Sequence, residues 1–263
     1  MLFPADWQIP NYTEQCFHDK ANKYCLVIPV INEGARIQEQ LKKLHDRALD
    51  QCLDIIIADG GSSDGSLQEE FLKTVGVSAL LTKKDAGKLS AQLRMGYAWA
   101  LQHGYEGIIT IDGNGKDSVE SIPLFIQALN AGIDYAQASR FIQGGENINA
   151  PLFRSLAIRL IHAPLISLAA RHWFTDTTQG FRAYSRKFLL DDRVKPFRAC
   201  FQRYELLAYL SVRATQLGYR AQEVPSTRSY PALGAIPTKI SPVHGSVDLL
   251  ATLFSACLGR YHP

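Results

Sequence analysis

The feature that most constrains the fold of this chain is an alternation of short apolar runs with helix-like segments. Apolar runs predict strands at 25–30, 53–58, 77–81 and 107–111, and amphipathic patterns predict helices over 34–49, from residue 66, and over 88–103. Alternation of this kind is typical of βαβ units, whose strands lie parallel in one sheet. The first half of the chain therefore predicts an α/β fold with a mostly parallel, Rossmann-like central sheet flanked by helices.

Polar side chains collect directly after these expected strands. They are Asn32, Glu33, Asp59, Asp64, Asp112 and Asn114. Open α/β sheets bind ligands in the crevice beyond the carboxyl ends of their strands. The pattern therefore predicts that these residues meet in one binding crevice, although they lie far apart in the sequence.

Composition bounds the classes of protein to consider. A chain of 263 residues with 46% hydrophobic content can form one core, so we expect one domain. The formal net charge of +3 comes without a long basic run, which argues against nucleic acid as a partner. The five cysteines form no C-x-x-C pair and the N-terminus lacks a continuous apolar stretch, so we expect a cytoplasmic protein with reduced thiols.

Two later apolar segments bear on contact with a membrane. The segments 160–170 and 247–258 are both shorter than the roughly 20 apolar residues that span a bilayer. We expect them to be helices packed on the core. Arg154, Arg159 and Arg171 punctuate the stretch 152–173, so a peripheral position at the membrane interface stays open as a second interpretation.

Five short motifs occur in a fixed order along the chain. They are VIPVINE at 27–33, DGGSSDGS at 59–66, IDGNGKD at 111–117, SRFIQGG at 139–145 and DTTQGFRAY at 176–184. Together they resemble glycosyltransferase family 2, and most closely its dolichyl-phosphate mannose synthase and polyprenyl-phosphate glycosyltransferase branch. Further matches are YELL at 204–207, GYRAQEVP at 218–225 and PTKIS at 237–241. The joint occurrence of the motifs in order carries the resemblance, because each one alone is only moderately specific.

The resemblance implies a fold and an activity. The fold is GT-A, with a glycosyltransferase domain over 24–241, an N-terminal extension over 1–23 and a C-terminal helix over 242–263 packed on the domain. The activity is that of an inverting, metal-dependent hexosyltransferase, which moves a sugar from a nucleotide-diphosphate sugar to an acceptor. The acceptor stays open between a polyprenyl phosphate and a glycan of the cell envelope or an exopolysaccharide.

For the donor, the resemblance implies a nucleotide site at the strand ends. The expected binding residues are Pro29, Asn32, Glu33, Asp59, Lys88, Asp112 and Gly113. Asp112 and Asn114 would hold a divalent cation, Mg²⁺ or Mn²⁺, because hard ions take oxygen ligands. The chain departs from the family pattern at Gly60 and Asn114, where carboxylates are expected, and at Lys116, where related synthases have Gln. Local alternatives are a helix-capping loop after Asp59, an Asn-Gly turn at Asn114 and a solvated Lys88.

For the acceptor and the leaving group, the resemblance implies a second set of residues. Asp176 is the candidate general base for a hydroxyl acceptor, and Arg182 the candidate ligand of an acceptor phosphate. Arg228 and Lys239 would clamp the departing diphosphate. A structural ion pair between Asp176 and Arg182 is the alternative. An acceptor phosphate is ionised at neutral pH and needs no base.

Two rival functions stay in view. A catalytically silent sugar-nucleotide-binding scaffold is motivated by the departures at Gly60, Asn114 and Lys116. A sugar nucleotidyltransferase would share the α/β plan, but it needs a glycine-rich phosphate loop near the start of the chain, and residues 27–33 do not form one.

Overall fold

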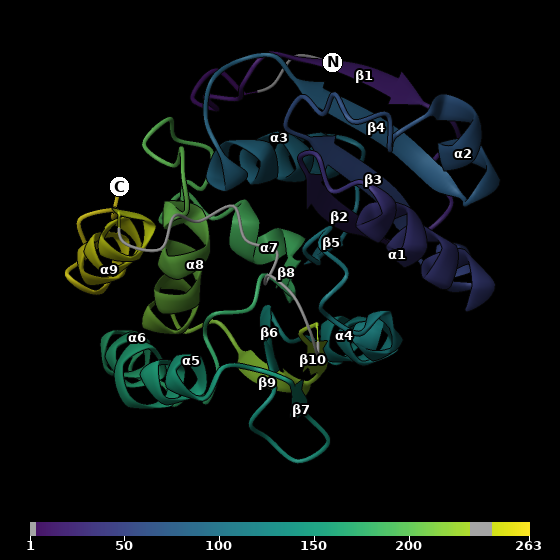
Figure 1. The fold of residues 1–263 in the computed structure, drawn as a ribbon. Helices are drawn as coiled ribbons and strands as arrows, with labels where there is room; N and C mark the ends of the chain where they lie inside the picture. Colours follow the sequence, from purple (N-terminus) through teal and green to yellow (C-terminus); the bar gives the residue numbers. More distant parts are fainter. Residues whose placement is uncertain (1–3, 232–243) are drawn as a thin grey trace.

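The computed structural model describes residues 4–231 and 244–263, and it contains one eight-stranded sheet with helices on both faces (Figure 1). The strand order is β1-β4-β3-β2-β5-β8-β6-β9. The strands of this sheet are β1 Tyr12–Cys16, β2 Tyr24–Val30, β3 Asp54–Asp59, β4 Val77–Lys83, β5 Gly107–Thr110, β6 Tyr135–Ser139, β8 Arg182–Ser185 and β9 Ala221–Pro225. The predicted α/β fold with a mostly parallel sheet is confirmed.

The centre of the sheet follows the sequence pattern closely. Strands β4, β3, β2 and β5 pair in parallel, and every residue of β2, β3 and β5 is buried. Strands buried on both faces need apolar side chains in both directions, which is why these segments appear as continuous apolar runs. Successive side chains enter two separate cores, Val27 on one face and Ile28 on the other.

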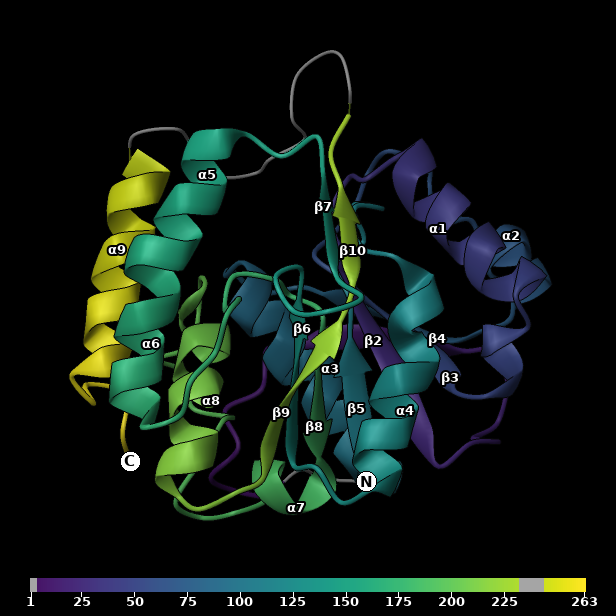
Figure 2. The same ribbon diagram turned by 90° about the horizontal axis from the view of Figure 1, so that it is seen from below.

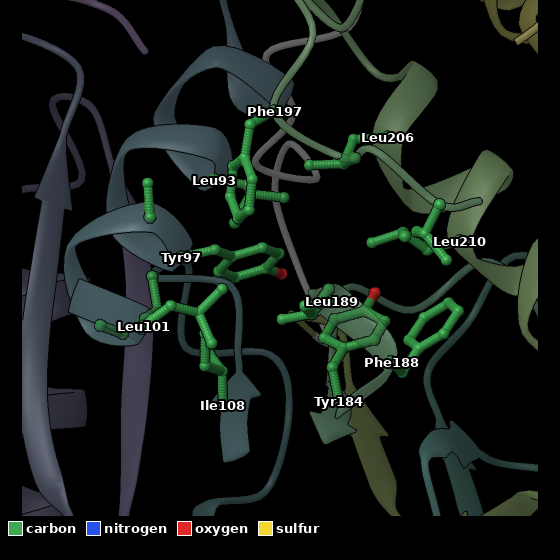
Figure 3. Close-up of a cluster of buried hydrophobic side chains, with 14 of the residues drawn as sticks. Leu93, Tyr97, Leu101, Ile108, Tyr184, Phe188, Leu189, Phe197, Leu206 and Leu210 are labelled. Atoms are coloured by element: carbon green, nitrogen blue, oxygen red, sulfur yellow. The ribbon is translucent and has the colours of Figure 1, made fainter. Parts of the chain in front are cut away.

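Helices cover these two faces. Helix α3 (Leu89–Gln102) packs on one face, and α1 (Ala35–Asp46) and α4 (Ile122–Asn130) pack on the other. Shorter helical elements are η1 Leu49–Gln51, α2 Glu69–Thr74, η2 Val119–Ser121 and α7 Arg186–Leu189. Figure 3 shows the core on the α3 face, where the ring of Tyr97 lies near that of Tyr184 of β8, and Phe188 of α7 lies on the other side of Tyr184. This core joins the two halves of the chain.

The second half of the chain breaks the parallel pattern. Strand β8 lies antiparallel between β5 and β6, and β9 then adds to β6 in parallel. A separate two-stranded ribbon pairs β7 (Glu146–Ile148) with β10 (Thr227–Ser229), and an isolated bridge joins Asp117 to Arg228. The insertion of β8 brings the loop that precedes it, residues 176–181, next to the end of β5.

The N-terminal segment takes part in the sheet. Strand β1 pairs antiparallel with β4, so the expected extension over 1–23 contributes an edge strand. Trp7 of the same segment stacks on Phe197, with 4.0 Å between the ring centres. Cys16, Cys25, Cys52, Cys200 and Cys257 form no disulfide with one another.

The segment 152–170 is helical throughout. It forms one continuous helical rod made of α5 (Leu152–Ala157), a π-helical turn η3 (Ile158–His162) and α6 (Ala163–Ala170). The expectation that residues 160–170 pack on the core is confirmed for α6, whose Ile166 and Ala170 are buried, whereas α5 has no buried residue. By length and composition the rod is the one helix of the described residues that could cross a membrane, with 22% of it buried.

The rod belongs to a small group of helices beside the sheet. Helices α6 and α9 (His244–Cys257) lie side by side, and both pack on α8 (Glu205–Gln216) (Figures 1 and 2). The rod is buried at Ile158, Ala163, Ile166 and Ala170, while Leu152, Phe153 and Leu160 face outward.

Candidate functional site

The carboxyl ends of the central strands bring the predicted donor residues to one edge of the sheet. Val30 pairs with Asp59, and Val27 pairs with Thr110, so the residues after each strand share that edge. Gln92 of α3 donates hydrogen bonds to the carbonyl oxygens of Val30 (2.7 Å) and Ala58 (2.9 Å). The loops containing Asn32, Glu33, Asp59 and Asp112 therefore start from a common, fixed platform.

The loops after β2 and β3 are tied to each other. The side chain of Asn32 accepts a hydrogen bond from the backbone of Ser63, while the backbone of Asn32 donates to the hydroxyl of Ser62. Asp59 is buried and accepts hydrogen bonds from both the backbone and the hydroxyl of Ser62. Asp59 thus fixes its own loop, whereas α2 begins only at Glu69, so neither Ser63 nor Asp64 starts a helix as the local alternative required.

Three further residues predicted to bind the nucleotide contact neighbouring parts of the chain. Pro29 is buried in β2, and a Cβ atom on Gly113 would lie 3.1 Å from its carbonyl oxygen. Gly113 therefore lets the loop after β5 cross close over β2. Glu33 forms an ion pair of 2.9 Å with Arg36 at the start of α1.

Asp112 lies at the centre of the arrangement. Its Oδ2 is 3.7 Å from Nη2 of Arg228 and 3.5 Å from Nδ2 of Asn114. On its other side, a Cβ atom on Gly180 would lie only 2.2 Å from Oδ1. The loop that precedes β8 therefore closes directly over this carboxylate.

Arg228 connects Asp112 to a second, deeper carboxylate. Its Nη1 lies 2.5 Å from Oδ2 of Asp117, which is completely buried. Burial is the largest influence and raises the pKa of Asp117, although Arg228 opposes it. Oδ1 of Asp117 has no hydrogen-bond partner within the described part of the chain. Asp117 thus acts first as the counter-ion of Arg228.

Four cationic side chains surround one aromatic ring, that of Tyr230. The ring centre lies 5.7 Å from Nζ of Lys116, 5.7 Å from the guanidinium carbon of Arg154 and 5.9 Å from that of Arg228. Arg140 donates a hydrogen bond of 3.3 Å to the tyrosine hydroxyl. We call these five residues the Tyr230 cluster.

Asp176 pairs with an arginine other than the expected one. Arg140 donates to both of its oxygens, at 2.7 and 3.1 Å, and both side chains are almost fully buried. Burial alone raises the pKa of Asp176, but the hydrogen bonds from Arg140 and Gln179 outweigh it and hold the pKa below its ordinary value. This placement favours the structural alternative, an ion pair, over a general base.

Arg182 is enclosed rather than facing a crevice. Its guanidinium donates to the carbonyl oxygens of Gln179 (2.9 Å), Thr177 (2.9 Å) and Leu207 (2.5 Å), and to the hydroxyl of Ser211 (2.7 Å). These contacts tie the loop 176–180 to α8. The guanidinium therefore positions that loop, whereas the sequence had indicated direct contact with an acceptor phosphate.

Of the two predicted lysines, the structure describes Lys88. Lys88 is exposed on the loop before α3, one turn ahead of Gln92, with its Nζ 6.0 Å from the ring centre of Tyr204. Lys88 is therefore at the same edge of the sheet as the donor loops. Lys239 lies outside the described residues.

A cavity opens beside Asn114 and Lys116 and has a volume of about 580 Å³. Its walls are α1, the loop 114–120 and residues 227–231; the lining includes Arg36, Gln40, Asn114, Lys116 and Tyr230, but not Asn32, Glu33, Asp59 or Asp112. Ligand pockets typically enclose about 300–1,000 Å³, so a nucleotide sugar fits in size. Most of its charged lining was absent from the sequence-based predictions.

Comparison with protein families identifies the chain at this point. The model of "Glycosyl transferase family 2" matches residues 25–191, which include β2, Asp59, Asp112 and the loop 176–180. The chain belongs to glycosyl transferase family 2. The predicted family is therefore confirmed, and with it the assignment as a glycosyltransferase.

Individual relatives extend the family match. The chain is 29% identical over 217 residues to the polyprenol monophosphomannose synthase of Mycolicibacterium smegmatis, covering 80% of this chain and 78% of that protein. It is 26% identical over 251 residues to the dolichyl-phosphate hexose transferase of Haloferax volcanii, covering 94% and 97% respectively.

A similar solved structure is that of glucosyl-3-phosphoglycerate synthase from Mycobacterium tuberculosis in complex with Mn²⁺, UDP and its product. Its TM-score is 0.61 at 17% identity, covering 89% of this chain and 79% of that chain. This likeness confirms the GT-A fold of the family 2 member described here.

The predicted metal site can be tested against the donor atoms present. Oδ1 of Asn114 accepts a hydrogen bond from the backbone of Lys116, and its amide nitrogen faces Asp112. Within the part of the chain that the structure describes, no group of three His, Cys, Asp or Glu side chains could hold a metal ion. One carboxylate that already contacts Arg228 is a poor donor set for a dication. The assignment of a cation to Asp112 and Asn114 stays a prediction.

Sequence reasoning missed several residues of the site. Arg140 and Gly180 lie inside motifs that were recognised, but nothing in the local sequence pairs Arg140 with Asp176 or places Gly180 on Asp112. Tyr230 follows β10 directly and carries no motif of its own. The four cationic side chains around Tyr230 come together only in the folded structure.

Proposed function

We propose that this family 2 glycosyltransferase transfers a sugar from a nucleotide-diphosphate sugar to the phosphate of a polyprenyl phosphate. The observation that carries the proposal is the Tyr230 cluster next to Asp112 and the cavity. Such a concentration of cations suits two phosphate-bearing substrates. The relatives named as polyprenol, undecaprenyl-phosphate and dolichyl-phosphate sugar transferases support the same acceptor class.

The chemistry follows from the charges. Direct attack by an acceptor phosphate oxygen forms a bond to the anomeric carbon, and the bond to the diphosphate breaks with inversion. The negative charge that develops on the leaving diphosphate needs fixed positive groups, and Arg228 is held next to Asp112 for that role. An ionised acceptor phosphate needs no base, in agreement with an Asp176 that is buried and paired. An acceptor hydroxyl would need one.

The outer face of the α5–α6 rod supports a peripheral position on the cytoplasmic face of a membrane. Leu152, Phe153 and Leu160 are 75%, 83% and 70% exposed. Arg154 of the same rod belongs to the Tyr230 cluster, so the apolar face of the rod adjoins the charged site. Apolar side chains interleaved with arginines are typical of helices that lie in the interface of an anionic bilayer.

The proposed reaction is tested by incubating purified protein with radiolabelled UDP- and GDP-sugars, an undecaprenyl phosphate and Mn²⁺ or Mg²⁺. We expect label in the lipid fraction, and a loss of about 10²–10³-fold in Asp112→Ala, since one electrostatic contact to the reacting charge is removed. Nucleotide binding without transfer to any acceptor would instead support the silent scaffold. Transfer to a glycan but not to the lipid would overturn the acceptor assignment.

The membrane position is tested by co-sedimentation with vesicles that contain phosphatidylglycerol. The double variant Leu156→Glu/Leu160→Glu should remain in the supernatant, because it places two charges on the proposed apolar contact. Leu124→Glu is the matched control, since Leu124 is also exposed but lies on α4, on the other side of the sheet. Equal sedimentation of both variants would contradict the proposal.

A further inference from the structure

Lys116 adds a positive charge to the site at a position where the family pattern has a neutral residue. The family resemblance gives a glutamine at this position and a carboxylate at Asn114. Lys116 is only 8% exposed, although a lysine usually keeps its ammonium group in water. A buried lysine at the edge of the donor cavity calls for a chemical reason.

Four charged side chains surround the ammonium group of Lys116. Arg228 and Arg154 repel it because they are also cations, and the carboxylates of Asp112 and Asp117 attract it. These five side chains therefore comprise three cations and two carboxylates. Both carboxylates also interact with Arg228: Asp117 forms an ion pair with it, and Asp112 lies 3.7 Å from it.

An excess of buried positive charge is unfavourable in the free protein. It is compensated when an anion binds, because the anion then supplies the counter-charge in a region of low dielectric. The cavity beside Lys116 is the space in which that anion would lie. Under the proposed function, the anion of a nucleotide-diphosphate sugar is its diphosphate.

The same residues are arranged poorly for a dication. The amide nitrogen of Asn114, rather than its oxygen, faces Asp112 at 3.5 Å, and the guanidinium of Arg228 is 3.7 Å from the same carboxylate oxygen. A dication at Asp112 would also lie among the three cations named above. Asn114 stands where the family pattern has a carboxylate, and Lys116 stands where it has a glutamine. Both departures therefore make the site more positively charged.

We propose that Lys116 is a built-in cation for the donor's diphosphate, so that a divalent cation aids the transfer but is not required for it. This inference rests on the proposed function. As the acceptor oxygen bonds to the anomeric carbon, the electron pair of the breaking bond moves to the diphosphate oxygen. Lys116 and Arg228 face that developing charge from within the chain, and no proton has to move.

Nucleotide binding gives a readout that does not depend on turnover. Affinity for UDP and GDP is measured by titration calorimetry in EDTA, for wild type and Lys116→Met. We expect the better of the two nucleotides to bind wild type without metal, and Lys116→Met to bind it at least tenfold more weakly. Lys116→Arg keeps the charge and should retain most of the affinity. Lys187→Met is the matched control, because Lys187 also lies over a tyrosine ring, at 5.5 Å from Tyr219, but at the opposite edge of the sheet.

Transfer is then measured in EDTA and in Mn²⁺. Wild type should keep its rate in EDTA within about tenfold of its rate in Mn²⁺, whereas Lys116→Met in EDTA should fall by about 10²-fold. The variant Asn114→Asp/Lys116→Gln restores the family residues and should become strictly dependent on Mn²⁺. The same variant should also bind Mn²⁺ more tightly than wild type, as measured by electron paramagnetic resonance.

Each failure has a separate meaning. Absence of transfer with Mn²⁺ would count against the proposed function, while the binding arm would still decide the role of Lys116. Transfer in Mn²⁺ that vanishes in EDTA would overturn the Lys116 inference alone. Unchanged nucleotide affinity in Lys116→Met, with only the KM for the lipid phosphate raised, would assign Lys116 to the acceptor and overturn the inference as well.

Discussion

Gly180 lies so close to Asp112 that a Cβ atom on this glycine would be 2.2 Å from the carboxylate Oδ1. This distance is much shorter than a van der Waals contact. Any side chain at residue 180 would therefore displace the Asp112 carboxylate. The backbone of Gly180 has no positive φ, which means that the requirement for glycine is one of space. The loop before β8 is therefore part of the wall that holds Asp112.

Gly180→Ala should displace the Asp112 carboxylate and lower the transfer rate by about 10²-fold, the cost of a misplacement of about 1 Å at a reacting centre. The measurement is kcat with saturating donor. In an Asp112→Ala background the same change should cost little more, because the group that it displaces is already absent. Additive losses in the double variant would show that Gly180 acts independently of Asp112.

The buried pair of Arg140 and Asp176 predicts a strong effect on stability. Arg140→Met should lower the free energy of unfolding by about 3–5 kcal/mol, because it leaves the Asp176 carboxylate buried without its partner. Urea denaturation measures the loss. Arg140→Met/Asp176→Leu should recover much of it, since both charges are removed together. A double variant as unstable as the single one would argue against the pair as the cause.

Arg182 should behave as a positioning residue. Arg182→Met removes the four hydrogen bonds that the guanidinium donates to three carbonyl oxygens and one hydroxyl in a buried site, and we expect a loss of about 3 kcal/mol or more. At a temperature where the variant is folded, the KM for the lipid phosphate should be unchanged. A tenfold rise in that KM with unchanged stability would instead support direct contact with the acceptor.

His162 predicts how stability depends on pH. It ends the π-helical turn η3, its Nδ1 lies 2.6 Å from Oγ1 of Thr177, and burial, followed by Arg182, lowers its pKa to about 4. Because the folded-state pKa lies below the unfolded value of 6.5, the unfolded chain binds more protons between these values. The contribution of His162 is therefore present above pH 6.5 and is lost as the pH falls towards 4.

His162→Gln should remove that part of the acid sensitivity. Between pH 7 and pH 4 the variant should lose about 2 kcal/mol less stability than wild type, as measured by denaturation at each pH. His18→Gln, at an exposed histidine, serves as the control. Parallel curves for wild type and His162→Gln would contradict the assignment.

The sequence predicted the central sheet and the positions of its ligand loops well. Strands β2 to β5 are buried on both faces, so their apolar runs are local signals that do not depend on partners. The predicted packing of residues 160–170 on the core applies to α6, where Ala163 and Ile166 are buried, whereas Leu160 faces outward. The sequence does not separate the two, because both faces of this helix carry apolar residues.

The chain by itself determined the family, the α/β plan and the arrival of Asp59 and Asp112 at one edge of the sheet, because strand and turn patterns are short-range. Tertiary structure alone decided the partners of the charged groups. Asp176 pairs with Arg140, 36 residues away, and Arg228 with Asp117, 111 residues away. These choices depend on β8 entering between β5 and β6, which is a long-range event, and the energy of a buried charge is set by the neighbours that such an event brings.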